Sequence, residues 1–357
     1  MGRSWIRALT AALLCLLATG AMAVDYKIVT ASERGTYIQI GRDLAKFVAP
    51  DADITLASLP SAGSAENVQR LRYEQGVKFA IVQSDVYQAF LDRQAGGNAE
   101  ARSLIAPLRV VMSLYNEEIY FIVRADSTLQ SIHEIRDARI NVGPIGSGTA
   151  MTATTLYAQM FGGPPPDNRT SFLSNEDALV RLTGDRSIDV VAVVAGQPAK
   201  LLADMKPEAR QLIRLLKFDA DQPSSKTALK TYFKATVRAT SYPNLLTEDV
   251  PGLAVRAFLV TYDYRVGDTV NHLTRFVASL CRNFDRLQQE GHPKWREVQL
   301  ALPELGRGWT YYPATSRELR NCKPGTAGVS GVASQQTAPA SSRCTQQDKI
   351  LGLCSKP

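Results

Sequence analysis

A strand that ends in a glycine-rich loop and leads into a helix occurs repeatedly in this chain, and this repetition limits the fold more than any other feature. The clearest copy is a strand over 139–142, the loop 143–149 (GPIGSGT) and a helix over 150–161. Further copies begin at Tyr26 and at Phe79. Strands that alternate with helices form parallel sheets with helices on both faces. The pattern therefore predicts an α/β fold with doubly wound, mostly parallel sheets.

The repeat begins again near residue 125, which predicts a second lobe. Two apolar runs precede this point, over 108–115 and 118–124, and predict two strands separated by Asn116 and Glu117. A chain of 357 residues is too long for one ordinary core and suits two lobes. We therefore expect a ligand cleft between the two.

The end of the folded region is expected to return to the first lobe. The apolar run over 255–262 predicts a strand, and 268–289 predicts one long amphipathic helix. The predicted units are lobe 1, over 24–123 with about 240–322, and lobe 2, over 124–239.

The first 23 residues have the features of a secretory signal peptide. Arg3 and Arg7 precede an apolar stretch, and Ala21-Met22-Ala23 matches a small-residue cleavage site. The apolar stretch is too short to span a bilayer, which needs roughly 20 such residues. We expect cleavage near Ala23 and export of the mature protein.

Four cysteines follow this segment: Cys281, Cys322, Cys344 and Cys354. An even number in an oxidising compartment indicates two disulfides, and three pairings are possible. Proximity in the sequence favours Cys281–Cys322 and Cys344–Cys354. A zinc site is the weaker alternative, because the chain has no C-x-x-C motif and only 3 histidines. The stretch 323–357 is rich in small and polar residues and indicates a flexible linker with a Cys-bearing tail.

The residues that follow the predicted strands are candidates for a ligand site, because open α/β sheets bind ligands at the carboxyl ends of their strands. They are hydroxyls, amides, aromatic rings and glycines, several of them at the start of a predicted helix, where an anion is favoured. In lobe 1 the candidates are Ser32, Gly35, Thr36, Tyr37, Ser61, Gln83, Ser84 and Tyr115. In lobe 2 they are Gly146, Ser147, Gly148, Thr149, Asn175 and Gln197. For the loop 143–149 the alternative is a capped strand-to-helix turn that serves only the fold.

The same residues argue against catalysis and against a cofactor. No histidine is predicted beside a serine or cysteine nucleophile, and Gly146-Ser147-Gly148 is not a G-x-S-x-G elbow. Neither a Walker motif nor G-x-G-x-x-G occurs, so we expect no nucleotide cofactor. The net charge of +7 comes from scattered basic residues, which does not predict nucleic-acid binding. We expect a protein that is not an enzyme and holds no metal or cofactor.

The order and spacing of six stretches resemble the TAXI family of solute receptors for TRAP transporters. They are 32–47 (SERGTYIQIGRDLAKF), 61–76 (SAGSAENVQRLRYEQG), 79–90 (FAIVQSDVYQAF), 114–127, 141–153 and 249–260. The resemblance implies a two-lobed, type II-like periplasmic binding protein, monomeric, that closes on a small organic anion such as glutamate, a 2-oxo acid or a dicarboxylate. It also implies delivery of that anion to the integral membrane TRAP permease subunit. The chain departs from the family at Glu33-Arg34, where the family has small residues, and in its tail after residue 320.

Three other functions stay open at this point. The cleft could hydrolyse an ester or amide, in which case Ser147→Ala would abolish turnover. The protein could be the ligand-sensing module of an envelope signalling system, which a neighbouring histidine kinase gene would favour. It could also be the receptor of an ATP-driven importer.

Overall fold

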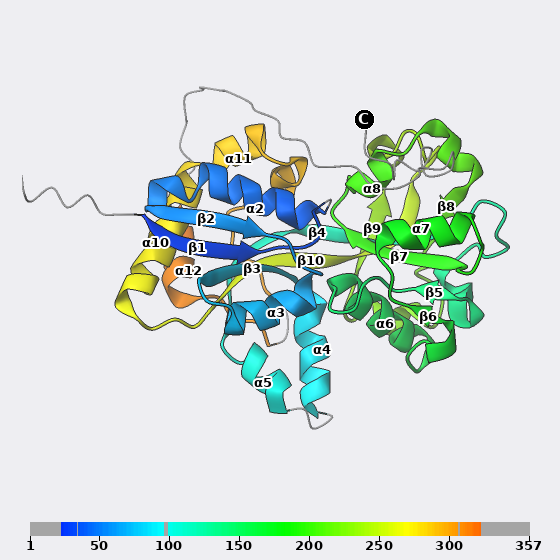
Figure 1. Ribbon diagram of the computed structural model, residues 1–357, viewed down its shortest axis with the longest axis horizontal. Helices are drawn as coiled ribbons and strands as arrows, with labels where there is room; N and C mark the ends of the chain where they lie inside the picture. The colour runs from blue at the N-terminus through cyan, green and yellow to red at the C-terminus, as the bar shows by residue number, and fades with distance from the viewer. Residues whose placement is uncertain (1–22, 34, 96–98, 306–307, 323–357) are drawn as a thin grey trace, which may run out of the picture.

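The computed structural model describes residues 23–33, 35–95, 99–305 and 308–322, and it has two lobes that lie side by side (Figure 1). The predicted signal peptide up to residue 22, Arg34 and the tail with the Cys344–Cys354 pairing lie outside these residues. Within the described ranges, no helix combines the length and the apolar composition needed to cross a membrane.

One ten-stranded sheet extends through both lobes in the order β2-β1-β3-β10-β4-β7-β5-β6, with β8 paired to β4 and β9 paired to β10. The strands are β1 (Val24–Val29), β2 (Ile54–Leu59), β3 (Val77–Gln83), β4 (Leu108–Arg124), β5 (Ile140–Asn141), β6 (Thr170–Ser171), β7 (Val190–Ala195), β8 (Ile213–Leu215), β9 (Phe233–Val237) and β10 (Val250–Tyr262).

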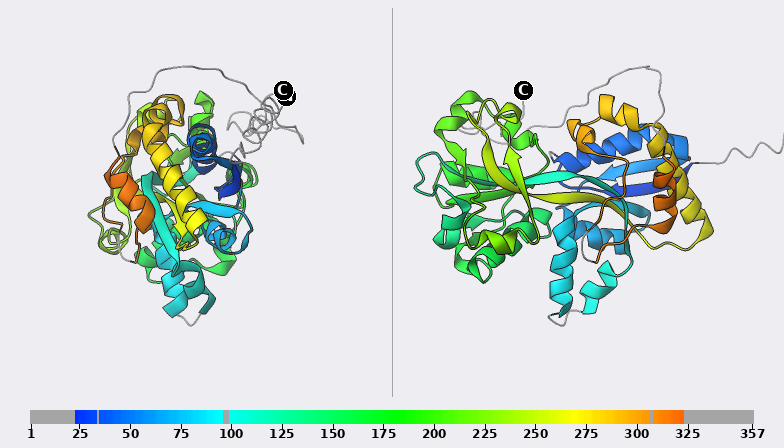
Figure 2. Two further views of the ribbon diagram at one scale, coloured as in Figure 1. Left: turned by 90° about the vertical axis from the view of Figure 1, so that its left-hand side faces the viewer. Right: turned by 180° about the vertical axis from the view of Figure 1, so that it is seen from behind.

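Each lobe contains three strands that are parallel, as the repeats predict. In lobe 1, β1 lies parallel to β2 and β3, and in lobe 2, β5 lies parallel to β6 and β7. The two parallel groups are not separate sheets, because β10 and β4 run antiparallel to each other and to their outer neighbours and join them. Figure 2 shows these two long strands passing between the lobes.

The strand β4 is continuous over 17 residues, whereas the sequence predicted two strands separated by Asn116 and Glu117. Both residues stay in the ladder, where Asn116 is opposite Arg256 and Glu117 is opposite Val255 of β10. The partner strand satisfies the backbone groups at this point, so the polar pair does not produce a turn.

Helices cover both faces of the sheet in each lobe. They are α2 (Thr36–Phe47), α3 (Ser64–Tyr73), α4 (Ser84–Ala95), α5 (Ala99–Ile105), α6 (Gly148–Phe161), α7 (Asn175–Thr183), α8 (Lys200–Ala203), α9 (Ser225–Ala228), α10 (Gly267–Arg282), α11 (Phe284–Glu290) and α12 (Pro313–Arg320). Short 3₁₀ helices are η1 (Pro50–Ala52), η2 (Ile132–Asp137), η3 (Asp167–Arg169), η4 (Pro207–Gln211), η5 (Ala239–Ser241) and η6 (Pro293–Glu297). The predicted fold class, a two-lobed α/β protein with doubly wound sheets, is confirmed.

Each lobe has one apolar core on each face of the sheet. In lobe 1, α2, α10 and α12 pack on one face and α3, α4 and α5 on the other (Figure 1). In lobe 2, α7 and α8 pack on one face and α6 and α9 on the other. Along β4, the side chains up to Tyr115 pack in the cores of lobe 1, and those from Ile119 onward pack in the cores of lobe 2. These residues locate one crossing between the lobes; the predicted division of the chain after residue 123 and near residue 240 stays a prediction.

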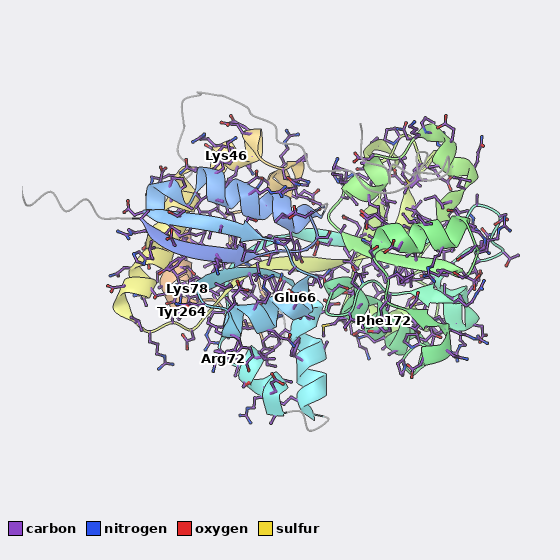
Figure 3. The ribbon with its side chains drawn as sticks, viewed as in Figure 1. Lys46, Glu66, Arg72, Lys78, Phe172 and Tyr264 are labelled. Atoms are coloured by element: carbon purple, nitrogen blue, oxygen red, sulfur yellow. A yellow bond between two sulfur atoms is a disulfide. The ribbon has the colours of Figure 1, made fainter. Side chains whose placement is uncertain are left out.

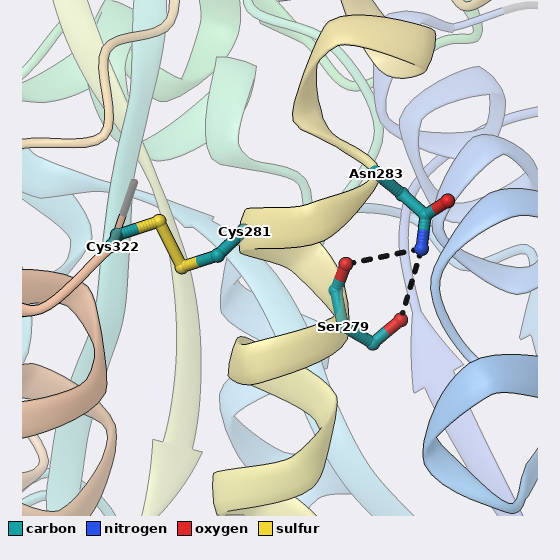
Figure 4. The surroundings of a disulfide bond; sticks show 4 residues. All are labelled: Ser279, Cys281, Asn283 and Cys322. Atoms are coloured by element: carbon teal, nitrogen blue, oxygen red, sulfur yellow. Dashed lines mark hydrogen bonds between the residues drawn. A yellow bond between two sulfur atoms is a disulfide. The ribbon is translucent and has the colours of Figure 1, made fainter. Parts of the chain in front are cut away.

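The long helix predicted over 268–289 is two helices, which meet at Asn283. Its Nδ2 donates hydrogen bonds to the backbone oxygen and Oγ of Ser279 (Figure 4), and a third to Oδ2 of Asp51 at 2.8 Å. An asparagine side chain that bonds nearby acceptors in this way offers the backbone an alternative to the helix. Close to this break, Cys281 forms a disulfide with Cys322, which ties α10 to the residues after α12.

Candidate functional site

A cavity of about 140 Å³ lies between the lobes, at the carboxyl ends of the parallel strands. Nine residues that the sequence singled out line it: Ser32, Gly35, Thr36, Tyr37, Gln83, Ser147, Gly148, Thr149 and Asn175. Residues Gly63, Ser64, Glu117, Ser174, Glu176 and Lys200 complete most of its polar wall.

Four helices of at least nine residues begin at the wall of this cavity, and the short helix α8 also begins there, at Lys200. The four are α2 from lobe 1 with Gly35 to Tyr37, α3 from lobe 1 with Gly63 and Ser64, α6 from lobe 2 with Ser147 to Thr149, and α7 from lobe 2 with Ser174 to Glu176. The first four N–H groups of a helix have no partner within it, and each N-terminus carries roughly half a positive charge. The cavity is therefore electropositive from the backbone alone.

Two of these helix starts are fixed by their own serines. Oγ of Ser147 accepts a hydrogen bond from the N–H of Ala150 at 3.0 Å, and Oγ of Ser174 accepts one from the N–H of Asp177 at 3.1 Å. Both serines have the extended ψ of a helix N-cap, and such caps stabilise a helix by about 1 kcal/mol. Each cap uses the N–H at the third position of its helix and fixes where the first turn lies at the wall of the cavity.

Gly148 touches the opposite lobe. A Cβ added to it would lie 1.7 Å from Oε1 of Gln83 and 2.7 Å from Oγ of Ser64. Gln83 is itself held, because its N–H donates to Oγ of Ser64 at 3.1 Å. The close approach to Gly148 is therefore made by the other lobe of this chain.

Glu117 brings a buried carboxyl group to the cavity from the middle of β4. It is only 3% exposed, and its Oε2 accepts a hydrogen bond from the hydroxyl of Tyr37 at 2.5 Å. Burial raises the pKa of Glu117 to about 8, although the Tyr37 hydrogen bond and the charge of Lys294 act in the opposite direction. Glu117 was not among the predicted site residues because Asn116-Glu117 resembles a turn in the sequence, and no local pattern distinguishes a turn from a continuous strand here.

A second carboxylate on β4 lies among the elements that connect the lobes. Glu118 accepts a hydrogen bond from the N–H of Gln197 at 2.8 Å, and it lies 3.6 Å from Nζ of Lys294. Lys294 is fully buried, lies 2.7 Å from Glu297 and donates to the carbonyl of Asn116 at 3.1 Å. This network joins η6 to the point where β4 passes into lobe 2.

Two further contacts join the lobes beside the cavity. Oδ2 of Asp85, at the start of α4, accepts hydrogen bonds from Thr152 on α6 at 2.6 Å and from Tyr232 at 3.2 Å. The N–H of Glu66 on α3 donates to the carbonyl of Gly146 at 3.0 Å. Figure 3 shows Glu66 on the lobe 1 side of this junction and Phe172 on the lobe 2 side.

Five predicted residues lie outside the cavity: Ser61, Ser84, Tyr115, Gly146 and Gln197. Ser61 supports the loop before α3, since its Oγ donates to Oδ1 of Asn67 at 2.6 Å. Gly146 has a positive φ of 84° and is used in the contact with Glu66. Both residues shape the loops that line the cavity without reaching it.

The other three are used within the sheet and at the lobe junction. Oγ of Ser84 accepts a hydrogen bond from the backbone of β10 at 3.4 Å. Tyr115 is buried next to Lys294, whose Nζ lies 5.5 Å from the centre of its ring. The side chain of Gln197 donates to the carbonyl of Thr236 at 3.2 Å. All three lie at or just after the end of a predicted strand, as the residues that line the cleft do, so their position in the sequence could not show that they face inward.

The departure from the TAXI pattern at Glu33 places a charge on the outer surface. Glu33 is paired with Arg42 at 2.7 Å, and both side chains are more than half exposed. Lys200, which sequence analysis did not select, lines the cavity and lies 2.6 Å from Asp204. Across the described ranges, no group of three His, Cys, Asp or Glu side chains is arranged to hold a metal ion.

The model of the NMT1-like family matches residues 28–305. Three solved structures are similar. One is described as a periplasmic transporter, with 13% identity over 85% of this chain and 96% of that chain and a TM-score of 0.45. A putative periplasmic sulfonate-binding protein, SsuA from Methylobacillus flagellatus KT, has 10% identity over 83% and 77%, with a TM-score of 0.45. PhnD1 from Prochlorococcus marinus (MIT 9301), in complex with methylphosphonate, has 11% identity over 72% and 84%, with a TM-score of 0.44.

Proposed function

This chain belongs to the NMT1-like family, and from this premise and the geometry of the cleft we propose that it is a periplasmic solute-binding receptor. Its ligand is a small organic anion of the glutamate, 2-oxo acid or dicarboxylate class, which it captures as the lobes close. It is exported, acts as a monomer and delivers the anion to a TRAP-type membrane permease. The observation that carries the proposal is the meeting of four helix N-termini at one cavity between two lobes.

Helix N-termini favour carboxylates because their free N–H groups donate hydrogen bonds and their dipoles attract negative charge. Two of the four come from each lobe, so an anion between them is held by both lobes at once. A ligand shifts the open–closed balance only by the difference in its affinity for the two states. A ligand that uses both pairs of helices has such a difference, since in an open form it contacts one pair only.

The surroundings of Ser147 support a receptor without a catalytic step. Its Oγ is used as the cap of α6, as described above. The histidines bond elsewhere: His133 to Ser224 at 2.9 Å, His272 to Tyr26 at 2.8 Å and His292 to the N–H of Lys294 at 3.2 Å. None of these three rings lines the cavity, so no histidine is placed there to activate the serine.

A thermal-melt screen of the mature protein tests the anion class. The panel contains carboxylic acids, amino acids, sugars and inorganic phosphate. A ligand at 100 times its Kd adds about 2.7 kcal/mol to the free energy of unfolding. For lobes of this size this raises the Tm by roughly 2–4 °C per kcal/mol. Shifts confined to ligands that carry a carboxylate support the proposal, whereas shifts with sugars alone contradict it.

A charge placed at the helix starts gives the matched test. Thr149→Asp places a carboxylate side chain, similar in size to threonine, in the first turn of α6, where a negative charge is compatible with the helix. This charge should repel the carboxylate ligand found in the screen and weaken its binding at least tenfold. Thr269→Asp makes the same change in the first turn of α10, away from the cavity, and should leave binding unchanged. Equal affinity of both variants would show that the ligand does not lie at the start of α6.

The transporter is tested by uptake into membrane vesicles from the source cells with the mature protein added. Uptake that an ionophore abolishes and that proceeds without ATP supports a TRAP-type permease. Uptake that requires ATP would assign the receptor to an ATP-driven importer.

A further inference from the structure

The cavity contains two hydrogen-bond acceptors that a plain carboxylate ligand does not use. One is the carboxyl group of Glu117 on β4. The other is Oδ1 of Asn175 on α7, which is buried in the wall of the cavity and has no hydrogen-bond partner. A buried acceptor without a donor costs roughly 1–3 kcal/mol, and a ligand that supplies the donor recovers it.

Glu117 is held in a fixed position. The hydroxyl of Tyr37 donates to its Oε2, and Tyr37 is itself 4% exposed at the first turn of α2. The strand on either side of Glu117 is paired to β10. A carboxyl group fixed in this way can orient a cationic or N–H group of a ligand.

The charged and titratable groups that face Glu117 come from four elements. Tyr37 on α2 and Lys294 on η6 favour its ionised form, whereas Glu118 on β4 and Asp85 on α4 oppose it. Burial has the largest effect and raises the pKa of Glu117 to about 8. At pH 7 the empty cavity therefore holds Glu117 with its proton. A cation next to the carboxyl would remove that proton, and an anion would strengthen its retention.

The other charged side chains of the described wall do not compensate a ligand with two negative charges. They are Glu176 and Lys200, and Lys200 is paired with Asp204 at 2.6 Å. The helix N-termini can neutralise one carboxylate, but a second carboxylate beside Glu117 would keep Glu117 protonated and would bring no donor to Oδ1 of Asn175. A ligand with one carboxylate and one cationic group fits the described wall better.

We propose that the ligand carries a protonated amine beside its carboxylate, with Glu117 as the counter-ion of the amine and the helix N-termini holding the carboxylate. This inference rests on the proposed function and narrows its ligand to amino acids. Glu117 is then the residue that determines specificity. On binding, the carboxyl proton of Glu117 passes to the solvent, and the ligand keeps its ammonium group.

The test compares each amino acid with the 2-oxo acid of the same skeleton: alanine with pyruvate, aspartate with oxaloacetate, glutamate with 2-oxoglutarate, and leucine with 4-methyl-2-oxopentanoate. Isothermal titration calorimetry at pH 7 in phosphate and in Tris measures both affinity and the number of protons released. We expect the amino acid of at least one pair to bind roughly tenfold to hundredfold tighter than its 2-oxo acid. We also expect it to release close to one proton.

Variants assign the proton to its source. Glu117→Gln should abolish the proton release and most of the preference for the amine. Glu248→Gln removes an exposed carboxyl outside the cavity and should behave as the wild type. The proton count of the wild-type protein does not depend on any variant, so it decides the question even if Glu117→Gln fails to fold.

The possible failures are distinguishable. If 2-oxo acids or dicarboxylates bind as tightly as amino acids and no proton is released, this inference is overturned and the anion receptor stands. Proton release that persists in a folded Glu117→Gln variant also overturns it. If no carboxylate of any class binds, the proposed function fails and the inference with it.

Discussion

Replacing Gly148 with alanine should hold the lobes apart while leaving each lobe intact. The added Cβ would lie 1.7 Å from Oε1 and 2.6 Å from Cδ of Gln83, which belongs to the other lobe. Real Cβ atoms do not come this close to a neighbouring atom, so Gln83 must move or the lobes must separate. Gly148 starts α6 with an ordinary backbone conformation, so alanine causes no strain within its own lobe.

The expected loss of ligand affinity in Gly148→Ala follows from the cost of overpacking. Gln83 is only 3% exposed and its N–H and Oε1 both contact Ser64, so it cannot rotate away freely. An extra methyl group at a packed contact costs about 1–3 kcal/mol. If the closed form alone bears this cost, ligand affinity falls roughly 5-fold to 150-fold. The melting temperature without ligand should not fall, because alanine in place of glycine stabilises a helix by about 0.5–1 kcal/mol.

The assay is calorimetric titration with the ligand identified in the screen, together with small-angle scattering to compare the dimensions of the free and liganded protein. Gly163→Ala is the control, since a Cβ there has no neighbour within 4 Å. The double variant Gly148→Ala with Gln83→Ala removes the clashing group. It should bind more tightly than expected from the sum of the single changes.

Affinity of Gly148→Ala within twofold of the wild type would show that Gly148 and Gln83 do not clash in the liganded protein. Strictly additive effects in the double variant would show the same.

Three further predictions concern stability. Burial raises the pKa of Asp85 to about 6, above its value in the unfolded chain, so its contribution to the free energy of unfolding falls as pH rises from about 4 to about 6. The free energy of unfolding of Asp85→Asn, measured by thermal melts, should therefore rise relative to that of the wild type by up to about 3 kcal/mol between pH 4 and pH 6. If the two proteins lose or gain stability in parallel over this range, Asp85 does not have the raised pKa. Lys294→Met should lower the free energy of unfolding in urea by about 3–5 kcal/mol, because it leaves Glu118 buried without its cation. Adding Glu118→Gln to the same chain should restore part of this loss. If it restores none, the two residues are not coupled. Opening the disulfide by Cys281→Ser with Cys322→Ser should cost about 4 kcal/mol, given a sequence separation of 41, and a loss below about 1 kcal/mol would show that the link adds little.

The loops that form the cavity could be predicted from the sequence because their cause is local. Ser147 caps α6 and Ser174 caps α7 through bonds to residues three positions on, and such spacing is visible in the sequence. The strand before each loop is apolar and the helix after it is periodic, so the order of elements also follows. Parallel strands then place their carboxyl ends at one edge of the sheet. This is why the loops at Gly35 and Gly148 face a common cavity.

The residues at the centre of the site could not be predicted in this way. Asn116 and Glu117 look like a turn in the sequence, and they remain in β4 only because β10, more than 130 residues later, satisfies the backbone at that point. The same pairing joins the two parallel groups of strands into a single sheet. A pairing between strands so far apart in the sequence cannot be recognised from the residues that flank either strand.

The alternation of strands and helices, the capped helix starts, and the hydroxyls and glycines at the strand ends follow from the sequence alone. Each of them depends on neighbours along the chain. Three features depend on the tertiary structure: Gln83 contacts Gly148, Ser61 and Gln197 bond to neighbouring residues without reaching the cavity, and Glu117 lines it. The physical reason is burial. The pKa and the hydrogen-bonding role of a carboxyl group depend on which distant groups exclude water from it, and two lobes folded against each other decide this together.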